Sequence, residues 1–186
     1  RGSTLIERKT AKEILAESLK ELSKTKPVDK ITIKEITDNC GFSKRTFYHN
    51  FQDKNELILW EYSNNYKKVL SQENLKLSYY EIMHKLIMFV VNDYDYYKNV
   101  FTVWDNSDIP IKYILDYAQN TFEDFIISKN NIKELTQEER IYLSIYNNGI
   151  YIFTVEWLNN GMPVSVEKLT QYFVNAVPEP IKKYLK

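Results

Sequence analysis

Apolar residues recur at spacings of three and four residues along almost the whole sequence, whereas strict alternation of apolar and polar residues is scarce. That spacing places the apolar side chains on one face of an α-helix. Only 4 glycines and 5 prolines stand among the 186 residues, which is too few turn signals for the many hairpins of an all-β protein. We therefore expect an all-α fold.

The stretch from Gly41 to Phe51 is expected to be a short helix with one buried face. Ser43 is a suitable N-cap because its hydroxyl accepts from the free N–H groups of the first turn, and Gly41 permits the tight turn before it. Phe47 and Phe51 lie four residues apart, so they share the face that should be buried. The outward groups suit phosphates and base edges, and they are Lys44, Arg45, Thr46, Tyr48 and His49. Taken alone, this pattern also fits the solvated face of a core helix.

The flanking sequence favours recognition of nucleic acid over a merely solvated face. A longer helix from Thr4 to Ser23 ends at Thr25-Lys26-Pro27, because the residue before a proline is disfavoured in a helix. Thr32 and Glu35 then have the spacing of a capping box at the start of another short helix. Two short helices behind a supporting helix form a helix-turn-helix unit, whose second helix enters the major groove.

Charge is divided unevenly along the chain, although its formal net charge is zero. Residues 1–54 carry 12 basic and 8 acidic side chains, and residues 55–186 carry 13 basic and 17 acidic side chains. A basic N-terminal segment on an acidic remainder indicates that only the first segment meets a polyanion. At its end, Asp53 is suited to cap the next helix. Lys54 in the first turn is then either a phosphate anchor or an ordinary surface lysine.

Residues 11–60 resemble the TetR family of bacterial transcriptional regulators in the order and spacing of their motif residues. The matching positions are Thr32-Ile33-Lys34-Glu35-Ile36, Gly41-Phe42-Ser43, Thr46-Phe47-Tyr48, Phe51, Lys54 and Leu57. The resemblance implies that phosphates are contacted by Thr32, Thr46, Tyr48 and Lys54. It also implies that Ser43, Lys44, Arg45 and His49 face the groove. Arg45 and Asn50 depart from the residues usual in the family, so the operator sequence does not transfer.

The resemblance implies two domains, a three-helix helix-turn-helix DNA-binding domain at residues 4–54 and a helical effector and dimerisation domain at residues 55–186. In the second domain we expect helices at residues 56–70, 79–101, 111–128, 136–159 and 165–177. The last two of these would pair with their counterparts in a homodimer. We assign to that interface Ile145, Ile152, Phe153, Trp157, Leu169 and Phe173, with a monomer core as the alternative. A two-fold dimer would present two recognition helices to an inverted-repeat DNA operator.

The resemblance also implies an effector pocket among the aromatic residues of the middle helices, and aromatic walls with a few hydroxyls suit a small apolar or planar ligand. The candidate residues are His84, Tyr97, Phe101, Trp104, Tyr113 and Tyr117. The competing interpretation is an aromatic core with amphipathic surface tyrosines. Residues 150–163 also resemble the family subgroup of the dihydroxyacetone kinase operon activator, which implies a regulatory protein subunit as the partner in place of a small molecule.

Other functional classes find little support in the sequence. No nucleophile, base and orienting acid stand at a recognisable spacing, so we do not expect an enzyme. One cysteine, Cys40, and two histidines offer no set of metal ligands, and we expect no cofactor. The longest apolar-rich run, Ile141 to Leu158, is interrupted by polar residues, so no membrane span is expected. A single cysteine fits a reducing compartment, so a cytoplasmic location is expected. Repression and activation remain equally open, because they depend on where the operator lies.

Overall fold

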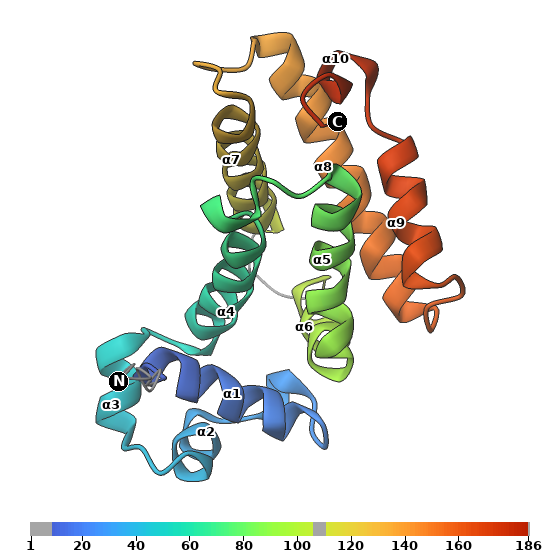
Figure 1. Cartoon of the computed structure of the whole chain (residues 1–186). Coiled ribbons are helices and arrows are strands. Elements are labelled where there is room, and N and C mark those ends of the chain that lie inside the picture. Colours follow the sequence, from blue (N-terminus) through green and yellow to red (C-terminus); the bar gives the residue numbers. More distant parts are fainter. Residues whose placement is uncertain (1–8, 106–110, 186) are drawn as a thin grey trace, which may run out of the picture. The chain divides into compact units, whose positions relative to one another are not determined.

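The computed structural model of the chain describes residues 9–105 and 111–185, with the side chains of residues 103–105 and 111 left aside. These described residues form ten α-helices and two short 3₁₀-helices, and they contain no β-strand (Figure 1). The expected all-α fold is confirmed. No helix in the described part is both long enough and apolar enough to cross a membrane.

The chain divides into two compact units, which we call the head (residues up to Glu61) and the body (Tyr62 onward). The head comprises α1 (Ala11–Ser23), η1 (Val28–Lys30), α2 (Ile33–Asn39), α3 (Lys44–Asn50) and the start of α4 (Lys54–Val69). Its core is apolar and is formed by Leu15, Leu19, Val28, Ile31, Ile36, Phe47, Phe51, Leu57 and Ile58. The hydroxyl of Ser18 donates to the carbonyl of Ile36 at 2.7 Å, which ties α1 to α2.

The division falls inside α4, whereas the sequence analysis placed the domain boundary after Lys54. The first two turns of α4 belong to the head because Leu57 and Ile58 are buried there. One turn later, Glu61 forms a nearly buried ion pair with Lys20 of α1.

Helix starts follow the local capping signals. Thr32 with Glu35 and Thr136 with Glu139 form the two predicted capping boxes, with both reciprocal hydrogen bonds present. A capping box of Thr10 with Glu13 also opens α1 at Ala11, whereas the predicted start at Thr4 lies outside the described residues.

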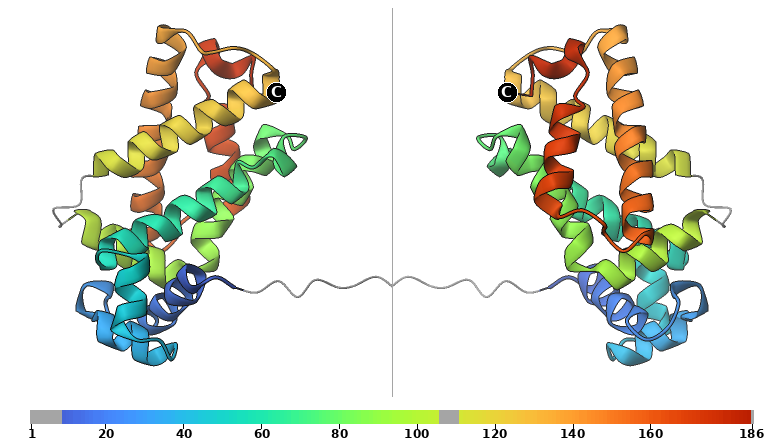
Figure 2. Two further views of the ribbon diagram at one scale, coloured as in Figure 1. Left: turned by 90° about the vertical axis from the view of Figure 1, so that its left-hand side faces the viewer. Right: turned by 90° about the vertical axis from the view of Figure 1, so that its right-hand side faces the viewer.

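The body adds η2 (Gln72–Asn74) and six α-helices to the remainder of α4. They are α5 (Tyr79–Asn92), α6 (Tyr94–Asp105), α7 (Ile111–Asn130), α8 (Gln137–Asn159), α9 (Val166–Asn175) and α10 (Glu179–Lys182). Helix α5 packs against α9, whereas α6, α7 and α10 pack against α8 (Figures 1 and 2). A buried hydrogen-bond chain joins three of these helices. The hydroxyl of Tyr79 donates to that of Tyr146 at 2.9 Å, which donates in turn to the carbonyl of Phe173.

Two expectations for the body require correction. The single helix expected at residues 79–101 is divided at Asp93, which has φ −118° and ψ 44° and therefore leaves the helical region. Its carbonyl accepts from the N–H of Tyr97, so a new helix starts at once. Past Pro178 the chain also forms α10, which the sequence analysis did not predict.

Candidate nucleic-acid interface

Helix α3 turns its aromatic side chains into the head and its polar side chains to solvent. Phe47 is fully buried, and the Phe51 ring lies 5.9 Å from the rings of both Phe47 and Trp60. On the opposite side Tyr48 is 57% exposed. The other exposed residues at or in the helix are Ser43, Lys44, Arg45 and His49. The two phenylalanines therefore fix the rotation of α3 that keeps this polar set outward.

The ends of α3 are held by local hydrogen bonds. The Ser43 hydroxyl accepts from the N–H of Thr46 at 3.1 Å, as predicted for an N-cap, and the two hydroxyls lie 3.0 Å apart. Asn50 donates through Nδ2 to the carbonyl of Thr46 at 2.8 Å. Before the helix, Gly41 has φ +73°, and the N–H of Phe42 closes α2 on the carbonyl of Thr37 at 2.8 Å. The turn into α3 therefore needs a glycine.

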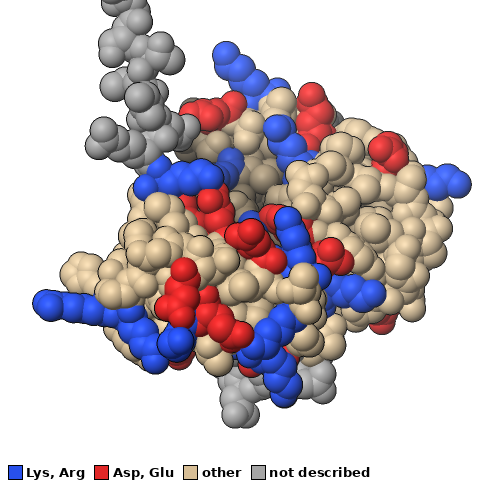
Figure 3. Space-filling model, turned by 90° about the horizontal axis from the view of Figure 1, so that it is seen from below, with Lys and Arg blue, Asp and Glu red and all other residues tan. Residues whose placement is uncertain are grey.

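The polar face of α3 carries cations that are open to a polyanion. An open hollow of about 480 Å³ is lined by Ser43, Arg45, Thr46, Tyr48 and His49. Within the described residues, no carboxylate lies at ion-pair distance from Lys44 or Arg45, whereas Lys34 of α2 pairs with Asp38 at 3.2 Å. Basic and acidic side chains alternate over the face shown in Figure 3. On the face shown there, any attraction of an anion to the described residues is therefore local to a few side chains.

Thr32 lies at the exposed N-terminal end of α2. Its hydroxyl donates to a carboxylate oxygen of Glu35 at 2.8 Å and accepts from the Glu35 N–H at 3.2 Å. Lys26 also pairs with this carboxylate, at 2.6 Å. Hydrogen bonds from Lys26 and Thr32 hold the pKa of Glu35 at about 2, so the cap stays ionised at neutral pH.

Lys54 is placed differently from the free phosphate anchor that the sequence suggested. Its ammonium donates to the carbonyls of Val28 at 2.6 Å, Asp29 at 3.1 Å and Ile31 at 2.7 Å. An ammonium has three protons, so all its donors are engaged inside the head.

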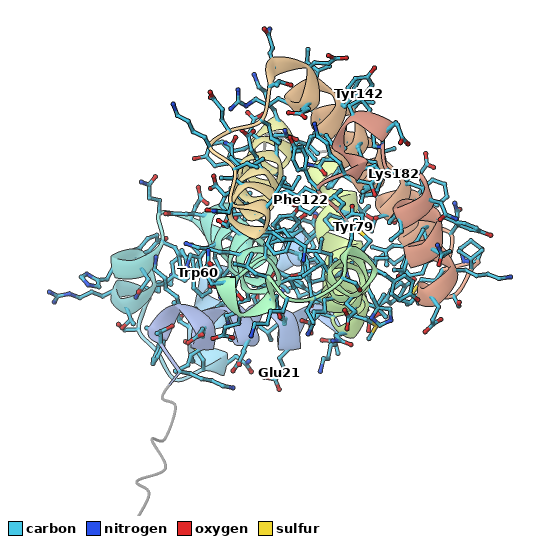
Figure 4. The ribbon with its side chains drawn as sticks, turned by 45° about the horizontal axis from the view of Figure 1, so that its top comes forward. Glu21, Trp60, Tyr79, Phe122, Tyr142 and Lys182 are labelled. Carbon is cyan, nitrogen blue, oxygen red and sulfur yellow. The ribbon has the colours of Figure 1, made fainter. Side chains whose placement is uncertain are left out.

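The body contains a mostly apolar, partly open cavity of about 70 Å³. Its walls come from Tyr62, Tyr66, Met83, Leu86, Ile87, Phe89, Val90, Phe101, Ile114, Leu115, Ala118, Phe122, Asn147, Ile150, Tyr151 and Thr154. Figure 4 shows Phe122 in the interior of the body, where its ring lies 6.0 Å from that of Tyr79. Helices far apart in the sequence form these walls, so the spacing of aromatic residues could not have located Asn147 or Thr154.

Of the five predicted effector residues whose side chains the structure describes, only Phe101 lines this cavity. Tyr97 is fully buried beside it and accepts a hydrogen bond from Asn65, while Tyr117 donates to the carbonyl of Ser63. His84 stacks on Tyr80, and Tyr113 is 68% exposed. The side chain of Trp104 lies outside the described residues. The described part also contains no group of three or more His, Cys, Asp or Glu side chains arranged to hold a metal ion.

The six predicted dimer residues separate into an exposed set and a buried set. Ile145, Ile152 and Phe153 are 63%, 56% and 48% exposed on α8. In contrast, Trp157, Leu169 and Phe173 are buried within the protomer, which corrects their assignment to the interface surface. Trp157 donates to the carbonyl of Val164, Leu169 and Phe173 lie on the buried side of α9, and the Phe173 ring supports that of Phe153 at 6.0 Å.

The exposed apolar residues of α8 and α9 form one continuous surface, which we call the α8–α9 face. It consists of Ile141, Tyr142, Ile145, Gly149, Ile152, Phe153, Tyr172 and Ala176. A groove of about 380 Å³ lies within it, and Tyr142 projects from the α8 end in Figure 4. Large apolar residues gathered on one solvent-facing surface indicate a site of protein association.

Comparison with known proteins agrees with this architecture. Residues 14–59 match the N-terminal sequence pattern described as bacterial regulatory proteins of the tetR family. The chain is 21% identical over 173 residues to the HTH-type dhaKLM operon transcriptional activator DhaS of Lactococcus lactis subsp. lactis (strain IL1403). The match covers 91% of this chain and 90% of the relative.

Two solved structures share the fold. The dihydroxyacetone kinase operon activator DhaS superposes with a TM-score of 0.70 at 19% identity, over 95% of this chain and 98% of that one. A TetR transcriptional regulator from Rhodococcus sp. RHA1 superposes with a TM-score of 0.64 at 14% identity. This match covers 90% of this chain and 98% of that one. With a head that matches the tetR-family pattern over residues 14–59, and with this shared helical fold, the chain is a DNA-binding transcriptional regulator.

Proposed function

We propose that this regulator binds an inverted-repeat operator as a homodimer, with α3 of each head in a major groove. The observation that supports this most strongly is the exposed polar face of α3, which two buried phenylalanines hold outward. In this arrangement Thr46 and Tyr48 contact phosphates at the groove edges, and Thr32 does so once its hydroxyl turns from the Glu35 carboxylate. The residues that face the groove are Ser43, Lys44, Arg45 and His49. Arg45 is suited to bidentate recognition of guanine.

DNA binding is tested by fluorescence anisotropy on the DNA upstream of the protein's own gene, at several salt concentrations. Each phosphate neutralised on duplex DNA contributes about −0.9 to the slope of log affinity against log salt. We expect a steep negative slope on that DNA and weaker binding to scrambled DNA of the same length. Equal affinity for both, or an affinity that salt does not change, would exclude this function.

The α8–α9 face supports a second copy of this chain as its occupant. Gly149 lies at the centre of the face, with Ile145 four residues before it and Phe153 four residues after it. Glycine inside a helix costs about 1 kcal/mol relative to alanine. Apart from its chain neighbours and its own helix backbone, no described atom lies within 4 Å of a Cβ built at this position, so packing among the described residues does not require glycine. Glycine would be required if the α8 backbone of a second copy crossed α8 at Gly149. A contact of this kind between two identical helices is self-complementary, as in a two-fold dimer.

Sedimentation equilibrium tests the homodimer. We expect a dimer at micromolar concentration and a monomer for Ile145→Glu, which places a charge in the apolar face. Lys112→Glu, a change at an exposed position of α7, serves as the control. A wild-type monomer at micromolar concentration, or a dimer unaffected by Ile145→Glu, would contradict this interface.

Control by a ligand bound in the body is the next part of the proposal. The cavity is apolar and carries polar groups from Asn147 and Thr154, a pattern typical of small-molecule sites. Its volume of about 70 Å³ is below the roughly 300–1,000 Å³ of such sites, so a larger effector would have to open it.

A second candidate is a transcriptional activator whose body binds a regulatory protein subunit. The small cavity favours it, and so does similarity along most of the chain to a relative named as an operon activator. Ala118→Leu distinguishes the two candidates, because it fills the cavity while leaving the head unchanged. If Ala118→Leu binds DNA with unchanged affinity but no longer changes transcription when the wild type does, a ligand in the cavity is supported. A response equal to wild type supports a partner bound on the surface. Tyr113→Ala, at an exposed position of α7, is the control.

A further inference from the structure

We infer that Lys54 is a positioning residue for DNA binding, which fixes the start of α2 through the carbonyls of the η1 turn and does not itself bind a phosphate. This inference rests on the proposed contact between Thr32 and the DNA backbone. In this role the Lys54 ammonium binds carbonyls of its own protein, whereas a free surface cation would bind a DNA phosphate.

The three carbonyls that bind the ammonium come from one short segment. They belong to Val28, Asp29 and Ile31, and Nζ lies 2.6 to 3.1 Å from each oxygen. The side chains of Val28 and Ile31 are buried, so the segment cannot easily shift away from the ammonium. Thr32, the N-cap of α2, follows Ile31 directly. Lys54 therefore connects the first turn of α4 to the residue that begins α2.

The electrostatic surroundings agree with an internal role. Burial lowers the pKa of Lys54, and the Asp29 carboxylate partly opposes this effect. To reach a phosphate, the ammonium would have to leave three carbonyls. The hydrogen bonds to Val28 and Ile31 are partly buried, so that move would leave two partly buried carbonyls without their donor. A single exposed contact with DNA would have to replace all three bonds.

The variant Lys54→Arg distinguishes a phosphate contact from the contact with the η1 carbonyls. A phosphate contact would tolerate Lys54→Arg, since guanidinium binds phosphate well. The carbonyl contact would not, because a planar guanidinium spreads its N–H groups and cannot direct three of them from one compact centre. Lys54→Met removes the charge in both cases and keeps a flexible apolar stem.

The experiment measures affinity for the upstream DNA across a salt series for these variants. We expect Lys54→Met and Lys54→Arg each to lose at least tenfold in affinity while both keep the wild-type salt slope. Lys44→Met, which removes an exposed cation from α3, is the control and should reduce the slope. Wild-type affinity for Lys54→Arg, or a slope reduced by about 0.9 per head in Lys54→Met, would overturn the inference.

A double-mutant cycle with Thr32→Val tests the route through α2. We expect the loss in the double variant to be smaller than the product of the two single losses, because both changes disturb the same α2 terminus. If the affinity loss in the double variant equals the product of the two single losses, Lys54 acts independently of Thr32. That result would contradict the inference.

Lysine-side-chain ¹⁵N NMR tests the same contact in the wild-type protein, so this test does not require any variant to fold. Three short hydrogen bonds should give the Lys54 ammonium a slowly exchanging resonance without DNA, and this resonance should persist when DNA binds. A rapidly exchanging ammonium in the free protein would refute the carbonyl contact. The free-protein spectrum does not depend on DNA affinity, so failure of the inference and failure of the proposed function remain distinguishable.

Discussion

Replacing Gly149 with leucine should affect the folded protomer and the dimer in opposite directions. Leucine is about 0.8 kcal/mol more favourable than glycine inside a helix. A Cβ at position 149 meets no described atom within 4 Å beyond its chain neighbours and its own helix backbone. The substitution should therefore leave the protomer equally stable or raise its stability by up to about that amount.

In the dimer the same side chain would lie where the two α8 backbones approach. Forcing an additional large side chain into a packed interface costs about 1–3 kcal/mol, and 1.4 kcal/mol corresponds to a tenfold change in an equilibrium constant. A two-fold dimer contains the substitution twice. We therefore expect the dimer Kd to rise by at least tenfold.

Two measurements on the same samples check this prediction. Sedimentation gives the dimer Kd, and thermal unfolding at concentrations where wild type is monomeric gives the protomer stability. Gly149→Ala is the graded control, with a similar gain in helix stability and a smaller steric effect. A leucine variant that dimerises as tightly as wild type would refute the close approach at Gly149.

Three further outcomes follow from the head and the body. Phe47→Ala should destabilise the head by about 3–5 kcal/mol and abolish DNA binding, with dimerisation retained in sedimentation. Arg45→Ala should relax preference at particular base pairs by about 1–3 kcal/mol, whereas Tyr48→Phe should weaken all sequences alike in competition assays. For Glu139, burial alone would raise the pKa, but hydrogen bonds from Lys183 and its other donors hold it at about 2. Its stabilisation is therefore complete above its ordinary pKa of 4.5 and is lost as pH falls toward 2. Denaturation of Glu139→Gln should show a deficit of about 1–2 kcal/mol at pH 7 that narrows at acid pH, after allowance for screening around exposed Lys183.

Local signals were sufficient to predict much of the fold. The capping pairs Thr32 with Glu35 and Thr136 with Glu139 act within one turn, so the sequence alone reveals them. The division at Asp93 was missed because apolar residues continue on both sides of it. The apolar pattern cannot show that one residue between them leaves the helical region.

Contacts between distant segments account for the errors at the candidate sites. From the sequence, Lys54 is expected to be an exposed cation. Only the folded structure shows that carbonyls of residues 28–31 lie beside its ammonium. In α8 and α9, periodicity shows which residues are apolar but not which of them meet their own protomer. Trp157 and Phe173 therefore could not be separated from Ile145 and Phe153 before the packing was known.

The most direct test of the central claim is the stoichiometry and spacing of binding on the upstream DNA. Footprinting together with sedimentation of the complex would measure both. We predict two protomers on one inverted repeat, with half-site centres separated by about 10 base pairs or a multiple of that distance. One protomer per site, or protection without a repeated half-site, would contradict a homodimer that reads DNA through two copies of α3.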